Sequence, residues 1–197
     1  MKSMKPHSKE PPTFIGVDPG ANGALAILHG GVVYPRPVKK LAKRVNCHSH
    51  WRKDSLYLAL WAELSKWLGP TTYVVVERQV PCQSFKRGFP SRSYATTILY
   101  GNYMRLMGML DTSGVNVEEL RPLQWQQEMR LPAKAKRPDG EWKNLLKDEA
   151  QRLFPKVKVT LAVADALLLA YYCREKQAWL SKAKPFSRSY DANGEAC

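Results

Sequence analysis

The stretch FIGVDPGANGALAIL, residues 14–28, decides how the rest of the chain is interpreted. Its two apolar runs, 13–18 and 23–29, predict two strands that are joined by a tight turn at Pro19-Gly20-Ala21-Asn22. Asp18 ends the first strand directly before the turn. This acid is either an ordinary turn residue that satisfies its own backbone, or a carboxylate held on a rigid element to do chemistry.

The remaining apolar patterns predict a mixed α/β sheet, with three antiparallel strands plus parallel strands and helices on both faces. A third short strand, GVVYP, follows the Gly-Gly turn at 30–31, and TYVVVE, residues 72–77, has the continuous apolar character of a strand buried on both faces. Residues 39–53 carry six positive charges and no acid, and we expect a loop there. The other predicted elements are helices at 54–68, 93–110, 123–129, 141–154 and 162–182, and a strand at 115–122.

Length and charge limit the classes of protein to consider. At 197 residues we expect one domain, 13–183, with a flexible leader at 1–12 and a flexible tail at 184–197. Lys and Arg outnumber Asp and Glu by 31 to 17, and the net charge of +14 makes a polyanion the first partner to consider, nucleic acid ahead of an anionic membrane surface. A soluble basic protein without such a partner is the alternative.

The cellular setting is predicted from what the sequence lacks. The four cysteines form no CxxC pair, the leader has no apolar signal region, and no run of 18 apolar residues occurs. We therefore expect an intracellular, reducing compartment, either the cytoplasm or nucleoid of a bacterial host or an organelle, and neither secretion nor membrane insertion.

Three acids occupy positions that surface charge does not explain: Asp18, Glu77 at the end of VVVE, and Asp165 inside the apolar helix VTLAVADALLLAYYC. Taken singly, each has a structural alternative. Asp18 could close its turn, Glu77 could pair with Arg78 or Lys86, and Asp165 could partner a buried arginine. Taken together, they predict a carboxylate cluster at one end of the sheet, which a hard cation such as Mg²⁺ or Mn²⁺ would join.

The order of these motifs resembles a known family. IGVDPGANGALAI, VVVERQ and VADALLLA are similar to the three acidic motifs of the RuvC-like Holliday junction resolvases, which have an RNase H-like fold, and the phage and organellar members are the most similar. The segment LRPLQWQQEMRLP is also similar to that family, as is the helix that follows it, which has a lysine near its start and ends in Leu-Phe-Pro. The resemblance therefore covers roughly residues 13 to 175.

The resemblance implies a Mg²⁺-dependent endodeoxyribonuclease of DNA recombination and repair. A homodimer would make symmetric paired nicks in four-way DNA junctions. Asp18, Glu77 and Asp165 would be catalytic metal ligands, and Lys143 would lie near the scissile phosphate and offset the charge that builds on it.

The loop after the glutamate would carry an aromatic wedge that opens the junction, with Phe85 the first candidate and Phe89 the second. An exposed aromatic ring among basic residues can stack on an unpaired base; the alternative is a phenylalanine folded back onto the core. The basic segments are the expected phosphate contacts, with solvated charge as their alternative. The expected DNA-binding residues are Phe85, Lys86, Arg87, Phe89, Arg92, Lys39, Lys40, Lys43, Arg44, Lys134, Lys136 and Arg137.

One departure from the family pattern bears on activity. The family has a fourth acid, or a His, three to five residues before the last Asp, whereas this chain has Thr160, Leu161 and Ala162 there. A junction-binding protein of the same fold with weakened catalysis is therefore the second hypothesis. The first motif also resembles a phosphate loop of ATP-hydrolysing actin-like proteins, but the length and the second Asp-Gly loop of that class are missing.

Overall fold

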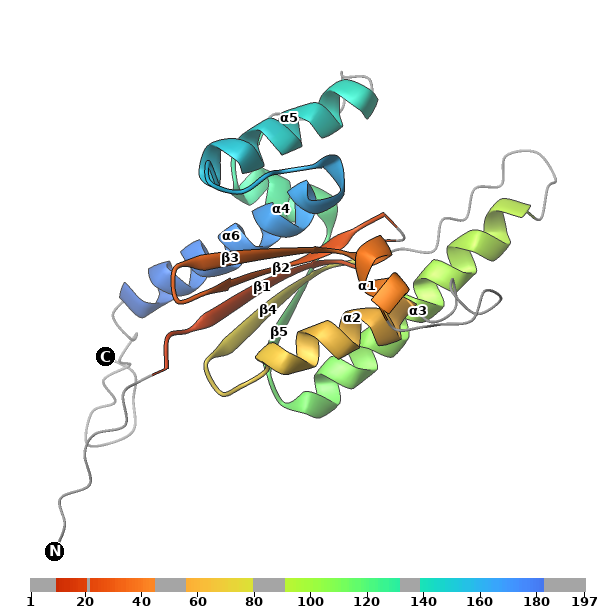
Figure 1. The fold of residues 1–197 in the computed structure, drawn as a ribbon, viewed down its shortest axis with the longest axis horizontal. Coiled ribbons are helices and arrows are strands. Elements are labelled where there is room, and N and C mark those ends of the chain that lie inside the picture. The colour runs from red at the N-terminus through yellow and green to blue at the C-terminus, as the bar shows by residue number, and fades with distance from the viewer. Residues whose placement is uncertain (1–9, 21, 45–55, 80–90, 132–138, 183–197) are drawn as a thin grey trace, which may run out of the picture.

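A computed structural model describes residues 10–20, 22–44, 56–79, 91–131 and 139–182. Within these residues, five strands form a single sheet in the order β3-β2-β1-β4-β5 (Figure 1). The antiparallel hairpins β1–β2 and β2–β3 make up one half, and β4 and β5 continue the sheet parallel to β1. The strands are β1 (Thr13–Asp18), β2 (Ala24–His29), β3 (Val32–Pro37), β4 (Thr72–Glu77) and β5 (Asn116–Leu120). This is the mixed sheet that the sequence predicts.

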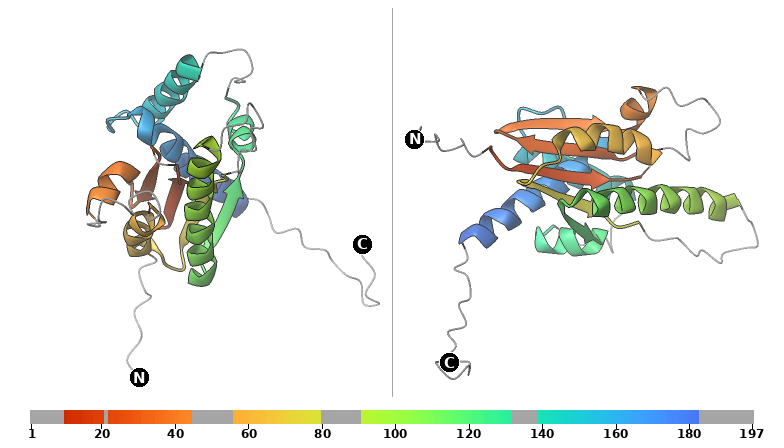
Figure 2. Two further views of the ribbon diagram at one scale, coloured as in Figure 1. Left: turned by 90° about the vertical axis from the view of Figure 1, so that its right-hand side faces the viewer. Right: turned by 90° about the horizontal axis from the view of Figure 1, so that it is seen from below.

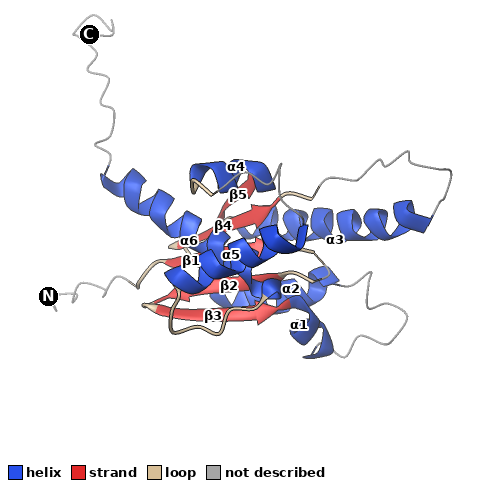
Figure 3. Cartoon of the chain, turned by 90° about the horizontal axis from the view of Figure 1, so that it is seen from above, coloured by secondary structure: helices blue, strands red, loops and turns tan. Residues whose placement is uncertain are grey.

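Helices cover both faces of the sheet. On one face α1, α2 and α3 enclose a core with the side chains of β1 and β2, and α2 and α3 lie side by side (Figure 2). On the other face α4, α5 and α6 form a second core, with α6 against β1 and β2 (Figure 3). Their bounds are α1 (Val38–Arg44), α2 (Leu56–Leu64) with a 3-10 turn at Ser65–Trp67, α3 (Ser91–Ser113), α4 (Pro122–Glu128), α5 (Asp139–Leu153) and α6 (Leu161–Lys182).

A glycine lets α6 lie directly against the central strand. Ile15 and Val17 of β1 point into the α1–α3 core, so Gly16 between them faces α6. A Cβ on Gly16 would come within 2.1 Å of the Ala166 carbonyl oxygen and 2.4 Å of the Ala170 amide nitrogen. The missing side chain thus allows the closest approach at the turn of α6 that carries Asp165.

The prediction of a loop at 39–53 is wrong for its first part, because residues 38–44 form α1. Val38 and Leu41, one helical turn apart, are 0% and 3% exposed against the core, so burial of these two side chains supports a helix in an otherwise basic stretch. The predicted leader and tail lie outside the described residues, except for 10–12. Within the part of the chain that is described, no helix has the length and apolar character needed to cross a membrane.

Candidate active site

Asp18 and Glu77 lie at the same edge of the sheet. Strands β1 and β4 run parallel with Val17 opposite Val76, and the next residue of each strand is the acid. Because parallel strands end at a common edge, the pairing brings together two carboxylates that are 59 positions apart (77 − 18) in the chain. Both side chains are half-buried.

The turn after β1 fixes the orientation of Asp18. The Gly20 amide donates a hydrogen bond to Asp18 Oδ1 at 2.9 Å, the pattern of an Asx turn. Gly23 lies so close that a Cβ there would come within 2.5 Å of Asp18 Cγ. Asp18 therefore accepts a hydrogen bond within its own turn, as one of the two alternatives for this residue expected. The same hydrogen bond holds its carboxylate rigidly at the sheet edge.

Glu77 has an indole as its hydrogen-bond partner. Trp125 Nε1–H donates to Glu77 Oε1 at 3.2 Å. Arg78, one of the ion-pair partners considered for Glu77, pairs instead with Glu119 on β5, with 2.9 Å between Arg78 Nε and Glu119 Oε1. Lys86, the other partner considered, lies outside the described residues.

The three acids influence one another electrostatically. Burial, followed by the charges of Asp18 and Asp165, raises the pKa of Glu77 to about 8, against a lowering by the Trp125 hydrogen bond. Burial and then the charge of Asp18 raise the pKa of Asp165 to about 6, which Lys143 opposes. Burial also raises the pKa of Asp18, while the Gly20 hydrogen bond and Lys143 lower it. Mutual repulsion of this kind is what a bound cation would relieve.

A pocket of about 560 Å³ opens beside the acids. Asp18 and Asp165 line it, together with Lys143 from α5 and Lys39 from α1. These helices cover opposite faces of the sheet, so the two lysines reach the pocket from both sides. The rest of the lining is Gly20, Asn22, Gly23, Pro37, Leu99, Leu161 and Ala162.

The segment where the resolvase pattern has a further acid or histidine lies at this pocket. Leu161, which is 51% exposed, and Ala162 both line it at the start of α6. Thr160 precedes the helix, and its carbonyl oxygen accepts hydrogen bonds from the amides of Val163 and Ala164, at 3.1 Å each. The wall is therefore apolar at two of the three positions where the family pattern has an acid or a histidine.

The donor chemistry of the site suits a hard cation, since carboxylate oxygens are the ligands that Mg²⁺ prefers. Among the described residues, however, no group of three or more His, Cys, Asp or Glu side chains is arranged to hold a metal ion. The side chains of Asp18, Glu77 and Asp165 therefore do not form a ready-made metal site in this arrangement.

The expected DNA contacts are only partly described. Lys39, at the pocket, and its neighbour Lys40 are exposed on α1. Arg92, Lys43 and Arg44 belong to helices α3 and α1, but the placement of their side chains is outside the description. Outside the described residues altogether are Phe85, Lys86, Arg87, Phe89, Lys134, Lys136 and Arg137.

Sequence reasoning did not single out Trp125, although it lies in the quoted segment LRPLQWQQEM. The signal available was a tryptophan three residues after the end of the strand predicted at 115–122. A buried indole needs an acceptor for its N–H, and an unpaired carboxylate nearby is one.

The sequence matches no protein-family model and no curated protein. Solved structures similar to the chain include two of one protein. One is RuvC of Thermus thermophilus, at 17% identity over 87% of this chain and 98% of that one, with a TM-score of 0.44. The other is T. thermophilus RuvC in complex with a Holliday junction substrate, at 19% identity over 88% and 98%, with a TM-score of 0.45.

The chain has an RNase H-like fold. Its strand order, three antiparallel strands followed by two parallel ones with helices on both faces, is the sheet expected for that class, and the predicted fold class is confirmed.

Proposed function

We propose that this chain is a metal-dependent endonuclease that cuts four-way DNA junctions. The observation that carries the proposal is the meeting of Asp18, Glu77 and Asp165 at one sheet edge, with Lys143 close enough to affect two of them. These acids come from three separate elements, and burial opposes their ionisation. A protein that gained nothing from ionised carboxylates here would not be expected to keep three of them together.

Each residue has a role in this scheme. Asp18, Glu77 and Asp165 would hold Mg²⁺ or Mn²⁺, which when bound supplies activation of water and charge stabilisation at phosphorus. Lys143, exposed on α5 and lining the pocket, would offset the negative charge that builds on the phosphate oxygens. Lys39, on the opposite side of the pocket, would bind a neighbouring phosphate of the same strand.

The substrate class follows from charge and from the resemblance of the three acidic motifs. A net charge of +14 favours a nucleic acid, and a branched substrate would expose unpaired bases for Phe85, or secondly Phe89, to stack on. In a homodimer, two sites related by a twofold axis would cut opposing strands symmetrically.

The second candidate is a protein of the same fold that binds junctions and cuts them slowly or not at all. The apolar pocket wall at Leu161 and Ala162 favours it, because the family pattern has a metal ligand in this segment. It is favoured as well by the finding that the described side chains form no ready-made metal site of three or more His, Cys, Asp or Glu residues.

A labelled, mobile four-way junction separates the two candidates. We expect the purified protein to make paired, symmetric nicks in Mg²⁺ or Mn²⁺ and none in EDTA. Asp18→Asn should abolish the nicks and keep junction affinity, and Asp111→Asn, on the exposed surface of α3, is the control for the same change of charge. Junction-selective binding without nicks would favour the second candidate. Equal affinity for junction and duplex DNA would contradict both.

A further inference from the structure

We infer that Trp125 is a positioning residue that holds Glu77 in the orientation needed to bind a cation. The inference rests on the proposed metal-dependent function and adds a residue to it. The Trp125 side chain is 0% exposed, and its only donor, Nε1–H, goes to a carboxylate of the acidic cluster, Glu77 Oε1, at 3.2 Å.

The chain path explains why Trp125 reaches this carboxylate. Strand β5 runs parallel to β4 and places Leu120 opposite Glu77. The chain leaves the sheet at Arg121, and Pro122 begins α4 immediately, so Trp125 lies about one turn into α4 and five residues beyond the end of β5. The indole thus returns to the sheet edge from which Glu77 projects.

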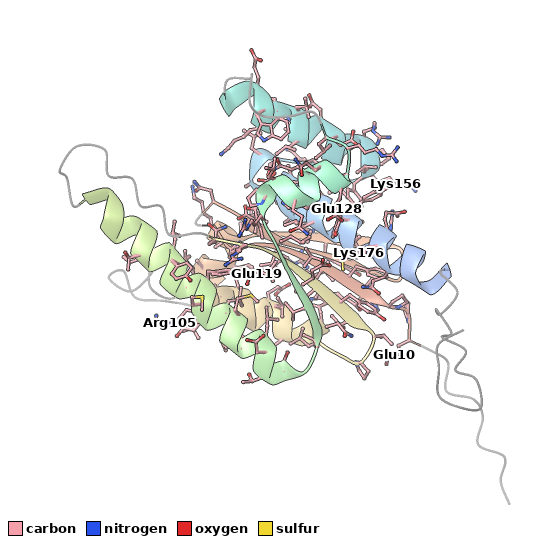
Figure 4. The ribbon with its side chains drawn as sticks, turned by 180° about the vertical axis from the view of Figure 1, so that it is seen from behind. Glu10, Arg105, Glu119, Glu128, Lys156 and Lys176 are labelled. Carbon is pink, nitrogen blue, oxygen red and sulfur yellow. The ribbon has the colours of Figure 1, made fainter. Side chains whose placement is uncertain are left out.

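Both ends of α4 are tied to their surroundings. Before the helix, the Arg78 amide donates to the Leu120 carbonyl oxygen at 2.7 Å. At its last residue, Glu128 accepts a hydrogen bond from Tyr172 Oη of α6 at 2.6 Å, and Lys176 donates to the same hydroxyl at 3.2 Å (Figure 4 shows Glu128 and Lys176). A helix of seven residues would not keep its place alone. These contacts fix α4, and therefore the indole, relative to α6, the helix that carries Asp165.

This arrangement suits a support for a metal ligand. One N–H satisfies one lone pair of Glu77 and leaves the remaining acceptor capacity of the carboxylate for a cation. An indole cannot ionise, so it orients the carboxylate without competing as a counter-ion, as an arginine or lysine would. Groups that hydrogen-bond to metal ligands typically set ligand orientation, and losing one costs roughly 10- to 100-fold in metal affinity.

The contact can be tested without metal by NMR of the indole N–H groups. The Trp125 signal is the one missing from Trp125→Phe. We expect Glu77→Ala to shift this signal and to speed its exchange with water, whereas Asp165→Ala, which keeps the acceptor and removes only a charge that acts on it, should change both much less. An unchanged signal in Glu77→Ala, or an equal change in Asp165→Ala, would overturn the inference.

Metal affinity then tests the consequence, by EPR titration with Mn²⁺ alone. Trp125→Phe should weaken Mn²⁺ binding about tenfold when Glu77 is present and less than about twofold when Glu77 is replaced by Ala. Trp142→Phe is the packing control, because Trp142 is 4% exposed in the same core cluster. Equal losses in both backgrounds, or the same loss in Trp142→Phe, would overturn a positioning role. Failure of the wild-type protein to take up Mn²⁺ would refute the proposed function, and the indole signal would then decide only whether Trp125 holds Glu77 in place.

Discussion

Replacing Glu77 by Gln should stabilise the metal-free protein, and the gain should grow with pH. Gln keeps the size of the side chain and an oxygen for Trp125 but carries no charge. Burial and the charges of Asp18 and Asp165 raise the pKa of Glu77 from 4.5 to about 8 in the folded protein. Below pH 4.5 the carboxyl group is neutral in both states. Between pH 4.5 and about 8 the unfolded chain loses a proton that the folded protein keeps, so the free energy of unfolding falls as pH rises.

The size of the effect follows from that interval. Each pH unit between the two pKa values costs about 1.4 kcal/mol, so the interval from 4.5 to about 8 corresponds to about 5 kcal/mol. Relaxation and entry of water reduce this cost, and we expect Glu77→Gln to gain about 2 to 4 kcal/mol at pH 9 and less than about 1 kcal/mol at pH 5. For a protein of this size the gain at pH 9 is a rise in Tm of roughly 5 to 15 °C.

Urea unfolding in EDTA at pH 5 and pH 9 measures the difference directly. Glu141→Gln, on the exposed surface of α5, is the control and should change stability by less than about 0.5 kcal/mol at either pH. A gain of the same size at both pH values would show that charge is not its source. A loss of stability at pH 9 would refute a buried, mutually repelling carboxylate at Glu77.

Three further substitutions test the packing and the site. Gly16→Ala should lower the free energy of unfolding, measured in urea, by about 3 kcal/mol, because its Cβ would lie 2.1 Å from a backbone oxygen of α6. Gly108→Ala, with no atom within 4 Å of its Cβ, is the control and should raise the free energy of unfolding by up to about 1 kcal/mol. A tolerated Gly16→Ala would contradict the close approach of α6. Ala162→Asp should tighten Mn²⁺ binding about tenfold, or about 1.4 kcal/mol, because it adds a carboxylate to the pocket wall. The uncharged Ala162→Ser is the control and should not tighten binding. Weaker binding by the Asp variant would exclude this wall from the metal site. Lys143→Met should lower kcat on a four-way junction about 100-fold, because it removes the charge assigned to the phosphate. Lys147→Met, one turn along α5, is the control and should leave kcat within about twofold. Equal effects of the two variants would contradict the role assigned to Lys143.

Strands and helices formed by an unbroken run of apolar residues were predictable from the sequence. The runs that form β1, β2 and β4 carry enough adjacent apolar residues to predict a strand locally, and α6 is apolar over most of its length. Helix α1 was missed because Val38 and Leu41 are its only fully buried positions with a described side chain, and a seven-residue helix depends on those tertiary contacts.

The sequence by itself determined which carboxylates the site could use and on which elements they lie. Asp18 and Glu77 end strands, and Asp165 interrupts an apolar helix, and each anomaly is visible within a few residues of chain. Only the tertiary structure decided that β1 and β4 pair in the register that sets the first two acids side by side, and that α6 approaches closely enough through Gly16 to bring in the third. The same holds for the hydrogen bond of Glu77, whose donor is 48 residues away along the chain. Local propensities act over a helical turn or a strand, whereas register, helix approach and hydrogen bonds between distant segments are set by the packing of the whole core.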